Sequence, residues 1–201
     1  MPFVIKPADC VIARFIEQQL NKPFSYPEVG SSRDVPPPGY ALDHYRILLG
    51  NGQPVFEAAS AALRQWEMFN IGWLQLCWPT TPIAPGSAVA VLGHCFGMWW
   101  LNACRIVYVV DESGPIRRFG FAYGTLVNHA ERGEERFMVE WRADNSVWYE
   151  VLAFSKPNRW LVRLGYPLAR RLQKRFGADS LAAMAGATQR LVAAASDGSR
   201  G

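Results

Sequence analysis

The sequence predicts an α+β fold in which a curved antiparallel β-sheet wraps around a long C-terminal helix. Residues 103–156 contain four segments rich in β-branched and aromatic side chains, separated by polar connections, which is typical of an antiparallel meander. Beyond Lys156, apolar residues recur at steps of four, as on one face of a helix. Packing that helix against the sheet would bury the apolar sides of both elements.

The first 40 residues precede the segments that are predicted to form the sheet and the C-terminal helix. Residues 8–20 place apolar side chains at helical spacing behind Asp9, a candidate N-cap, and so predict a short amphipathic helix. Residues 21–40 are rich in proline and glycine and predict an extended arm, with Phe24 and Tyr26 anchoring it to the body. A disordered linker is the alternative interpretation of this segment.

Residues 41–102 are expected to contribute one helix and three strands. Residues 45–49, 71–78 and 87–95 have the apolar and β-branched content of strands. Residues 54–69 predict a helix, because their apolar side chains recur at steps of three and four on one face.

Aromatic residues make up 13% of the chain and include eight Trp. Such a content predicts either a bulky core or the lining of an apolar cavity. Phe96, Met98, Trp99 and Trp100 fall in a segment that we expect to be a connection. Two interpretations of these side chains are open: they pack beneath the sheet edge, or they form a lid over a cavity.

The first hairpin of the meander is expected to have one apolar face. If residues 112–115 (ESGP) form a four-residue loop, Tyr108 lies opposite Phe119, and Ile106 lies opposite Phe121. One face of this hairpin is then almost wholly aromatic or aliphatic.

The second hairpin adds a carboxylate to that face. If residues 144–145 form a two-residue turn, Trp141 lies opposite Trp148, and Val139 lies opposite Glu150. A carboxylate among apolar side chains is costly unless it is paired or protonated. A shift of the register by one residue would turn Glu150 outward instead, and both arrangements are open at this point.

The C-terminal helix is expected to start near Tyr166, with Pro167 in its first turn, after a shorter turn at 159–164. Beyond Ala193 the chain is expected to fray. This order of elements is the helix-grip arrangement, in which a cavity often lies between the sheet and the last helix. The expected division is an N-terminal helix and arm (1–40), one helix-grip domain (41–195) and a frayed tail (196–201).

Charge, cysteines and motifs argue against several kinds of function. A net charge of +4 is too mild to require a nucleic acid partner, and none is expected. The four Cys and three His lack metal-binding spacing, and no nucleotide or hydrolase motif is present, so we expect no metal ion or cofactor. Without a signal peptide or a membrane-spanning run, a soluble, cytoplasmic monomer or homodimer is expected.

Several blocks of the sequence resemble an uncharacterised family. The runs PFSYPEVG, CRIVYVVDESG, RRFGFAYGTLVNHAERGEERFMVEW and VWYEVLAFSKPNRWLVRLGYPLARRLQKRF are similar to the bacterial and plant family described as domain of unknown function 1990, over roughly residues 3–185. This resemblance implies no activity and no catalytic residues. The element order also resembles the START-like, birch-allergen-like superfamily, whose members bind lipids, sterols or polyketides, act as cyclases, or serve as interaction modules.

The aromatic face of the meander predicts non-catalytic binding of a hydrophobic small molecule or lipid, in a cavity between the sheet and the C-terminal helix. Glu150 would anchor the polar part of that ligand. The candidate ligand-binding residues are Trp73, Trp99, Trp100, Tyr108, Phe119, Phe121, Tyr123, Trp141, Trp148 and Glu150.

Two other functions are open. Glu150 with His129 or Tyr123 would serve proton transfer in a cyclase-like enzyme, although His129 in a solvated loop is the simpler interpretation. The basic C-terminal helix is either a solvated face or a surface for an anionic membrane or a protein partner. The residues of that surface are Arg163, Arg170, Arg171, Lys174 and Arg175.

Overall fold

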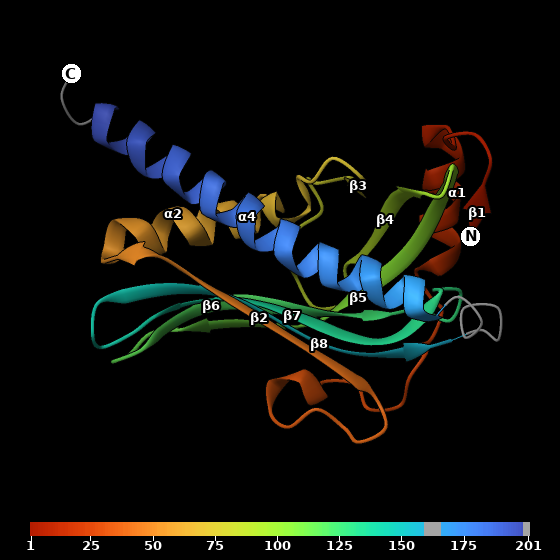
Figure 1. The fold of residues 1–201 in the computed structure, drawn as a ribbon, viewed down its shortest axis with the longest axis horizontal. Coiled ribbons are helices and arrows are strands. Elements are labelled where there is room, and N and C mark those ends of the chain that lie inside the picture. The colour runs from red at the N-terminus through yellow and green to blue at the C-terminus, as the bar shows by residue number, and fades with distance from the viewer. Residues whose placement is uncertain (159–165, 199–201) are drawn as a thin grey trace.

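A curved antiparallel sheet forms the body of the computed structural model, which describes residues 1–158 and 166–198 (Figure 1). Its strands are β1 (Pro2–Phe3), β2 (Ala41–Asn51), β3 (Leu74–Cys77), β4 (Ala88–Cys95), β5 (Met98–Glu112), β6 (Arg117–Thr125), β7 (Glu131–Trp141) and β8 (Ser146–Pro157). They pair in the order β2-β8-β7-β6-β5-β4-β3, and β1 pairs with the start of β5. The helices are α1 (Asp9–Gln19), α2 (Gln53–Arg64) and α4 (Tyr166–Gly198), with the short 3₁₀ helices η1 (Ser31–Arg33) and η2 (Glu67–Phe69).

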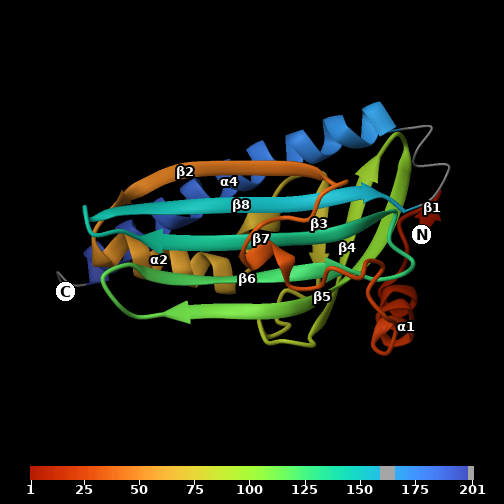
Figure 2. The ribbon, with the colours of Figure 1, turned by 90° about the horizontal axis from the view of Figure 1, so that it is seen from below.

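Helices α2 and α4 lie on the concave side of the sheet, which we call the inner face, and α4 runs along its length (Figures 1 and 2). The helix approaches the sheet closely at Gly177, where an added Cβ would lie 2.3 Å from the ring of Tyr45. A larger side chain at this position would push α4 away from β2. The predicted helix-grip fold, with an additional N-terminal helix, is confirmed.

Side chains fill the space between the sheet and the two helices. The inner core joins β5, β6, β7 and β8 to α2, η2 and α4, and its fully buried members include Leu63, Met68, Phe121, Phe137 and Tyr149. Each buried side chain of this size contributes about 1.5–3 kcal/mol. Helix α1 covers the opposite, outer face of β4 and β5 with a second core.

The structure confirms the strands and the helix expected between residues 41 and 95. The helix ends earlier than predicted, at Arg64, because Trp66 adopts a left-handed φ of 60°. The expected connection after residue 95 is wrong. Only Phe96 and Gly97 turn the chain, with φ of 53° and 71°, so Trp99 and Trp100 belong to β5. At the other end of the chain, α4 continues past Ala193 to Gly198.

The predicted register of the β5–β6 hairpin is wrong. Tyr108 pairs with Ala122 rather than with Phe119. A β-bulge at Val107 interrupts the pairing, because an extra residue lies between Tyr108 and Ile106. Ile106 therefore remains in the inner core, while Tyr108 turns to the outer face.

The register of the β7–β8 hairpin also differs from the prediction, by one residue. Glu150 pairs with Met138, not with Val139. The connection is longer than a two-residue turn: Asn145 adopts a left-handed φ of 70°, and its N–H donates to the carbonyl of Arg142 at 3.0 Å. Because side chains alternate along a strand, this shift turns Glu150 to the outer face.

The N-terminal arm is an ordered part of the fold and is held on the outer face by Glu134. Its carboxylate accepts hydrogen bonds from the Tyr26 hydroxyl at 2.6 Å, from the N–H of Gly30 at 2.8 Å and from the N–H of Ser32 at 3.0 Å. The Ser32 hydroxyl also donates to Glu134 and lies 2.7 Å from that of Tyr108. Glu134 is only 2% exposed, so this one carboxylate satisfies several buried donors.

We expect the substitution Glu134→Ala to lower the free energy of unfolding by about 3 kcal/mol or more, because it leaves buried donors unpaired. Urea denaturation would measure this loss, and limited proteolysis would show cleavage within residues 20–40. Glu17→Ala, at an exposed carboxylate of α1, serves as the control and should change stability by less than about 0.5 kcal/mol. Equal stability of the two variants would contradict this role of Glu134.

Candidate functional site

The predicted ligand-binding residues divide between the two faces of the sheet and do not line one space. The inner face carries Trp100, Phe119, Phe121, Tyr123 and Trp141. The outer face carries Trp99, Tyr108, Trp148 and Glu150. Trp73 lies before β3 and contacts α4, where its indole N–H donates to Asp179 at 2.8 Å.

Glu150 is an ion-paired residue of the outer face. Its carboxylate accepts a hydrogen bond from Arg136 at 2.6 Å and lies 3.1 Å from Nε2 of His44. Burial alone would raise the pKa of Glu150, but hydrogen bonds from His44 and Arg136 hold it below its ordinary value. Tyr123 lies on the other side of the sheet, so proton transfer between Glu150 and Tyr123 has no geometric basis.

His129 serves as a hydrogen-bond acceptor in the β6–β7 loop. Its Nδ1 accepts the N–H of Glu131 at 3.0 Å, and its carbonyl accepts a hydrogen bond from Asn158 at 2.9 Å. Burial lowers the pKa of His129 to about 4, so its imidazole is neutral at pH 7. These contacts tie the loop together and do not involve Glu150, so the predicted catalytic pair is not formed.

A group of polar side chains lies on the inner face, beside the N-terminal half of α4. We call it the inner polar cluster and define it as Asp43, Tyr123, Glu131, Glu135, Arg170 and Gln173. Arg170 donates to both carboxylate oxygens of Asp43, and its Nη2 lies 2.7 Å from Oδ1. Gln173 accepts from Arg170 at 2.5 Å and donates to Ser155 at 2.9 Å, so these contacts tie α4 to β2 and β8.

Glu135 has a different environment from that of Asp43. It accepts a hydrogen bond from the Tyr123 hydroxyl at 2.7 Å, and no Lys, Arg or His among residues 1–158 and 166–198 pairs with it. Burial raises the pKa of Glu135 from 4.5 to about 8 and that of Glu131 to about 6. At pH 7, Glu135 is therefore mainly a neutral carboxyl group with a proton to donate.

Aromatic rings adjoin Tyr123, the partner of this carboxyl group. The ring centroid of Tyr123 lies 5.4 Å from that of Phe137 and 6.2 Å from that of Phe69. The ring centroid of Phe176, in α4, lies 5.4 Å from that of Phe69. Glu135 itself is partly exposed. The Tyr123–Glu135 pair thus lies where the aromatic core meets solvent.

The polar run VNHAERGEER (127–136) is typical of a solvated loop, but its three glutamates Glu131, Glu134 and Glu135 lie in β7, which begins at Glu131. The two-residue step from Glu135 to Phe137 is the signal that would have placed Glu135 on the inner face. It is a weak signal, because three glutamates in five residues resemble a solvated loop more than a strand.

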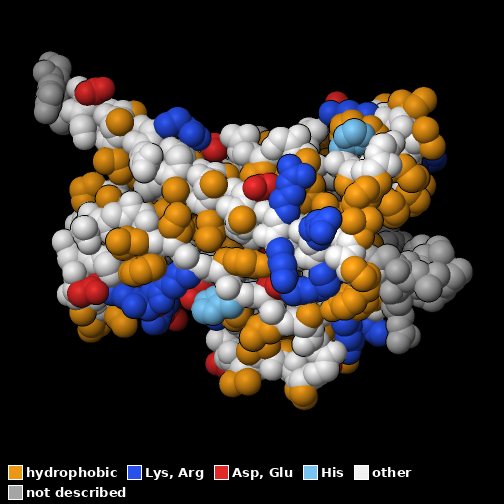
Figure 3. All heavy atoms as spheres, in the orientation of Figure 1, with side chains coloured by type: hydrophobic (Ala, Val, Ile, Leu, Met, Phe, Trp, Pro, Cys, Tyr) orange, Lys and Arg blue, Asp and Glu red, His pale blue; other side chains and the backbone are white. Residues whose placement is uncertain are grey.

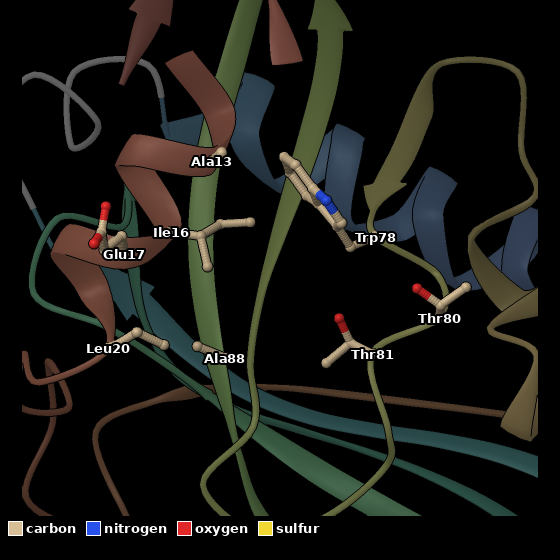
Figure 4. Close-up of a pocket in the computed structure, with 8 residues that line it drawn as sticks. All are labelled: Ala13, Ile16, Glu17, Leu20, Trp78, Thr80, Thr81 and Ala88. Carbon is tan, nitrogen blue, oxygen red and sulfur yellow. The ribbon is translucent and has the colours of Figure 1, made fainter. Parts of the chain in front are cut away.

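Two surface hollows lie away from the inner polar cluster. One, of about 310 Å³, lies between α1 and the segment that follows β3, where Ile16 and Trp78 extend into it from opposite sides (Figure 4). The other, of about 250 Å³, lies between the ends of the β5–β6 and β7–β8 hairpins. Neither hollow lies between the sheet and α4.

The described residues contain no group of three or more His, Cys, Asp or Glu side chains arranged to hold a metal ion. Within the same part of the chain, none of the helices has the length and apolar character needed to cross a membrane. The cysteines Cys10, Cys77, Cys95 and Cys104 are free thiols.

The fold and the inner polar cluster define a helix-grip protein with a group of polar and acidic side chains beside its last helix. Residues 25–183 match the family described as domain of unknown function (DUF1990), and the chain belongs to that family. A UPF0548 protein of Dictyostelium discoideum is 38% identical over 195 residues, covering 87% of this chain and 90% of that protein. A UPF0548 protein of Deinococcus radiodurans is 35% identical over 180 residues, covering 84% of this chain and 89% of that protein.

Two solved structures have a similar overall plan. Ara h 8.0201 is 13% identical, with a TM-score of 0.46, and the match covers 76% of this chain and 99% of that chain. Norcoclaurine synthase from Thalictrum flavum is 13% identical, with a TM-score of 0.44, and the match covers 76% of this chain and 86% of that chain. Likeness at this level concerns the arrangement of elements and says nothing about what this chain binds.

The raised pKa of Glu135 predicts a specific dependence of stability on pH. The unfolded chain loses this proton near pH 4.5, whereas the folded protein keeps it up to about pH 8, so the contribution of Glu135 to stability is present below pH 4.5 and is lost as the pH rises to about 8. Glu135→Gln removes this dependence. Urea denaturation from pH 5 to pH 9 should show the variant gaining stability relative to the wild type up to about pH 8.

Glu150→Gln is the matched control, because the pKa of Glu150 is shifted downward. Its contribution to stability is present above the unfolded pKa and is lost as the pH falls through the folded value. The variant should therefore be less stable than the wild type at neutral pH, and the difference should shrink in acid. Parallel pH profiles for the two variants would contradict the opposite pKa shifts of Glu135 and Glu150.

Proposed function

We propose that this protein binds a small molecule with a largely apolar body and one oxygen acceptor, at the solvent-facing edge of the inner core beside the N-terminal half of α4. The observation that carries this proposal is the Tyr123–Glu135 pair. A partly exposed carboxyl group on the inner face, without a cationic partner among the described residues, is costly to the fold and is typical of functional sites.

The chemistry of the pair supports a neutral ligand. Because burial raises the pKa of Glu135 to about 8, the group donates a hydrogen bond at neutral pH and offers no negative charge to attract a cation. A hydroxyl or carbonyl oxygen is the matching acceptor. The rings of Phe69, Phe137 and Phe176 adjoin Tyr123 and offer contacts for an apolar body.

This site replaces the one expected from the sequence. Glu150 was the predicted anchor, but it lies on the outer face with Arg136 and His44. Tyr123 lies in the inner core, and we assign the role of the polar anchor to Glu135. The ligand class, a hydrophobic small molecule or lipid, is unchanged.

Titration with an environment-sensitive apolar fluorophore, together with mass spectrometry of gently purified protein, tests the proposal. We expect saturable binding that weakens above about pH 8, where Glu135 loses its proton. Glu135→Leu should weaken binding about tenfold through loss of one hydrogen bond. Glu135→Gln, which retains a donor, should bind but lose the dependence on pH.

Glu150→Leu is the control, since it removes a carboxylate from the outer face of the same sheet, and its binding curve should match that of the wild type. Two results would each refute the proposal. One is the absence of both a retained molecule and saturable probe binding; the other is unchanged probe affinity in Glu135→Leu.

A further inference from the structure

One end of the molecule exposes large apolar side chains. Strand β1 pairs with the start of β5, and from Phe3 the chain continues toward the β4–β5 turn. Beside this pairing, Val4 and Ile5 are 79% and 80% exposed, and Phe96 at the turn is 60% exposed. Figure 3 shows hydrophobic side chains gathered over this end of the protein. Such a concentration is unusual on a surface that faces only water.

The N-terminal half of α4 exposes a stripe of basic side chains. Arg171, Lys174 and Arg175 are exposed and follow one another at helical spacing, with Leu168 at the start of the stripe, 41% exposed. No acidic residue occurs in α4 before Asp179. The Lys and Arg side chains over this part of α4 lie on the same side of the molecule as the apolar end (Figure 3).

Two members of this stripe have no acidic partner in the described part of the chain. Arg175 pairs with Asp179 at 3.3 Å and lies over the ring of Trp73 at 5.0 Å. By contrast, none of the ion pairs formed within residues 1–158 and 166–198 involves Arg171 or Lys174. Their charges are available to an external anion.

We propose that this surface docks on an anionic lipid membrane. Arg171 and Lys174 contact the phosphate-rich headgroups, while Val4, Ile5 and Phe96 enter the interfacial layer. A combination of exposed basic and large apolar side chains on one side of a protein suits a charged bilayer, which offers both chemistries at once. Arg163, also expected in this surface, lies outside the described residues.

The proposal is independent of the ligand site. On α4, Arg170 and Gln173 bind Asp43 and Ser155 of the sheet, whereas Arg171 and Lys174 are exposed. The same helix thus separates the inner polar cluster from the docking surface. Substitutions at the exposed positions leave Tyr123 and Glu135 untouched, so membrane binding and ligand binding can fail separately.

Sedimentation with vesicles of phosphatidylcholine, with and without phosphatidylserine, tests the proposal at low and high salt. We expect binding only when phosphatidylserine is present, and weaker binding at high salt. The double variant Arg171→Gln/Lys174→Gln should lower the partition coefficient about 30-fold. Phe96→Asn should lower it about tenfold, and Asn tolerates the left-handed φ of this position.

Two control variants remove charged or apolar side chains at exposed positions away from the proposed docking surface. Arg64→Gln/Arg190→Gln removes two charges from exposed residues near α2, and Val35→Ser removes an apolar side chain that is 84% exposed in the N-terminal arm. Both should sediment with vesicles as the wild type does. Thermal unfolding would verify that each variant is folded.

Three results with the wild type and the basic-stripe variant would each overturn the proposal. They are a lack of wild-type binding to anionic vesicles, binding of equal strength to neutral vesicles, and wild-type partition of the Arg171→Gln/Lys174→Gln variant. Loss of binding in the controls to the same extent would also overturn it, because the effect would then reflect net charge or overall hydrophobicity.

Discussion

The alternation of side chains along β7 is the constraint on which the rest of this structure depends. Glu134 and Glu135 are neighbours in the chain, yet the first points to the outer face and holds the N-terminal arm, while the second points to the inner face under α4. A slip of one residue would exchange them, leaving the arm without its acceptor. The left-handed residue Asn145 ends the β7–β8 connection and so contributes to setting this register.

Two anchors hold α4 on the inner face, and they differ in kind. At Gly177 the missing side chain lets the helix backbone approach the ring of Tyr45. Near the start of the helix, Arg170 donates to both oxygens of Asp43, and this paired geometry is strong because both groups are charged and Asp43 is only 9% exposed. Close packing and a charged clamp therefore fix the helix at two points along β2.

The inner polar cluster contains carboxyl groups in two different environments. Asp43 has a guanidinium partner, whereas Glu135 has only the Tyr123 hydroxyl among the described residues, and its pKa is raised to about 8 by burial. An apolar residue at position 135 would avoid the cost of burying a carboxyl group. We therefore attribute this carboxyl group to binding rather than to stability. The exposed half of α4 carries a second, separate set of charges, at Arg171 and Lys174.

The sequence by itself determined the elements and the architecture. Periods of two and of four residues and the turn-forming segments indicated the strands, the helix α2 and the long last helix, because local spacing decides which residues share a face within one element. Tertiary structure decided which residues of each strand lie on the inner face of the sheet and which lie on the outer face. The β5–β6 hairpin pairs Tyr108 three residues away from its predicted partner, with a bulge at Val107, and the turn ending at Asn145 shifts the β7–β8 hairpin by one residue. These odd-numbered shifts moved Tyr108 and Glu150 to the outer face. Strand pairing is set by contacts across the sheet, so local patterns gave only a weak signal that Glu135, and none that Glu150, belongs on one or the other face of the sheet.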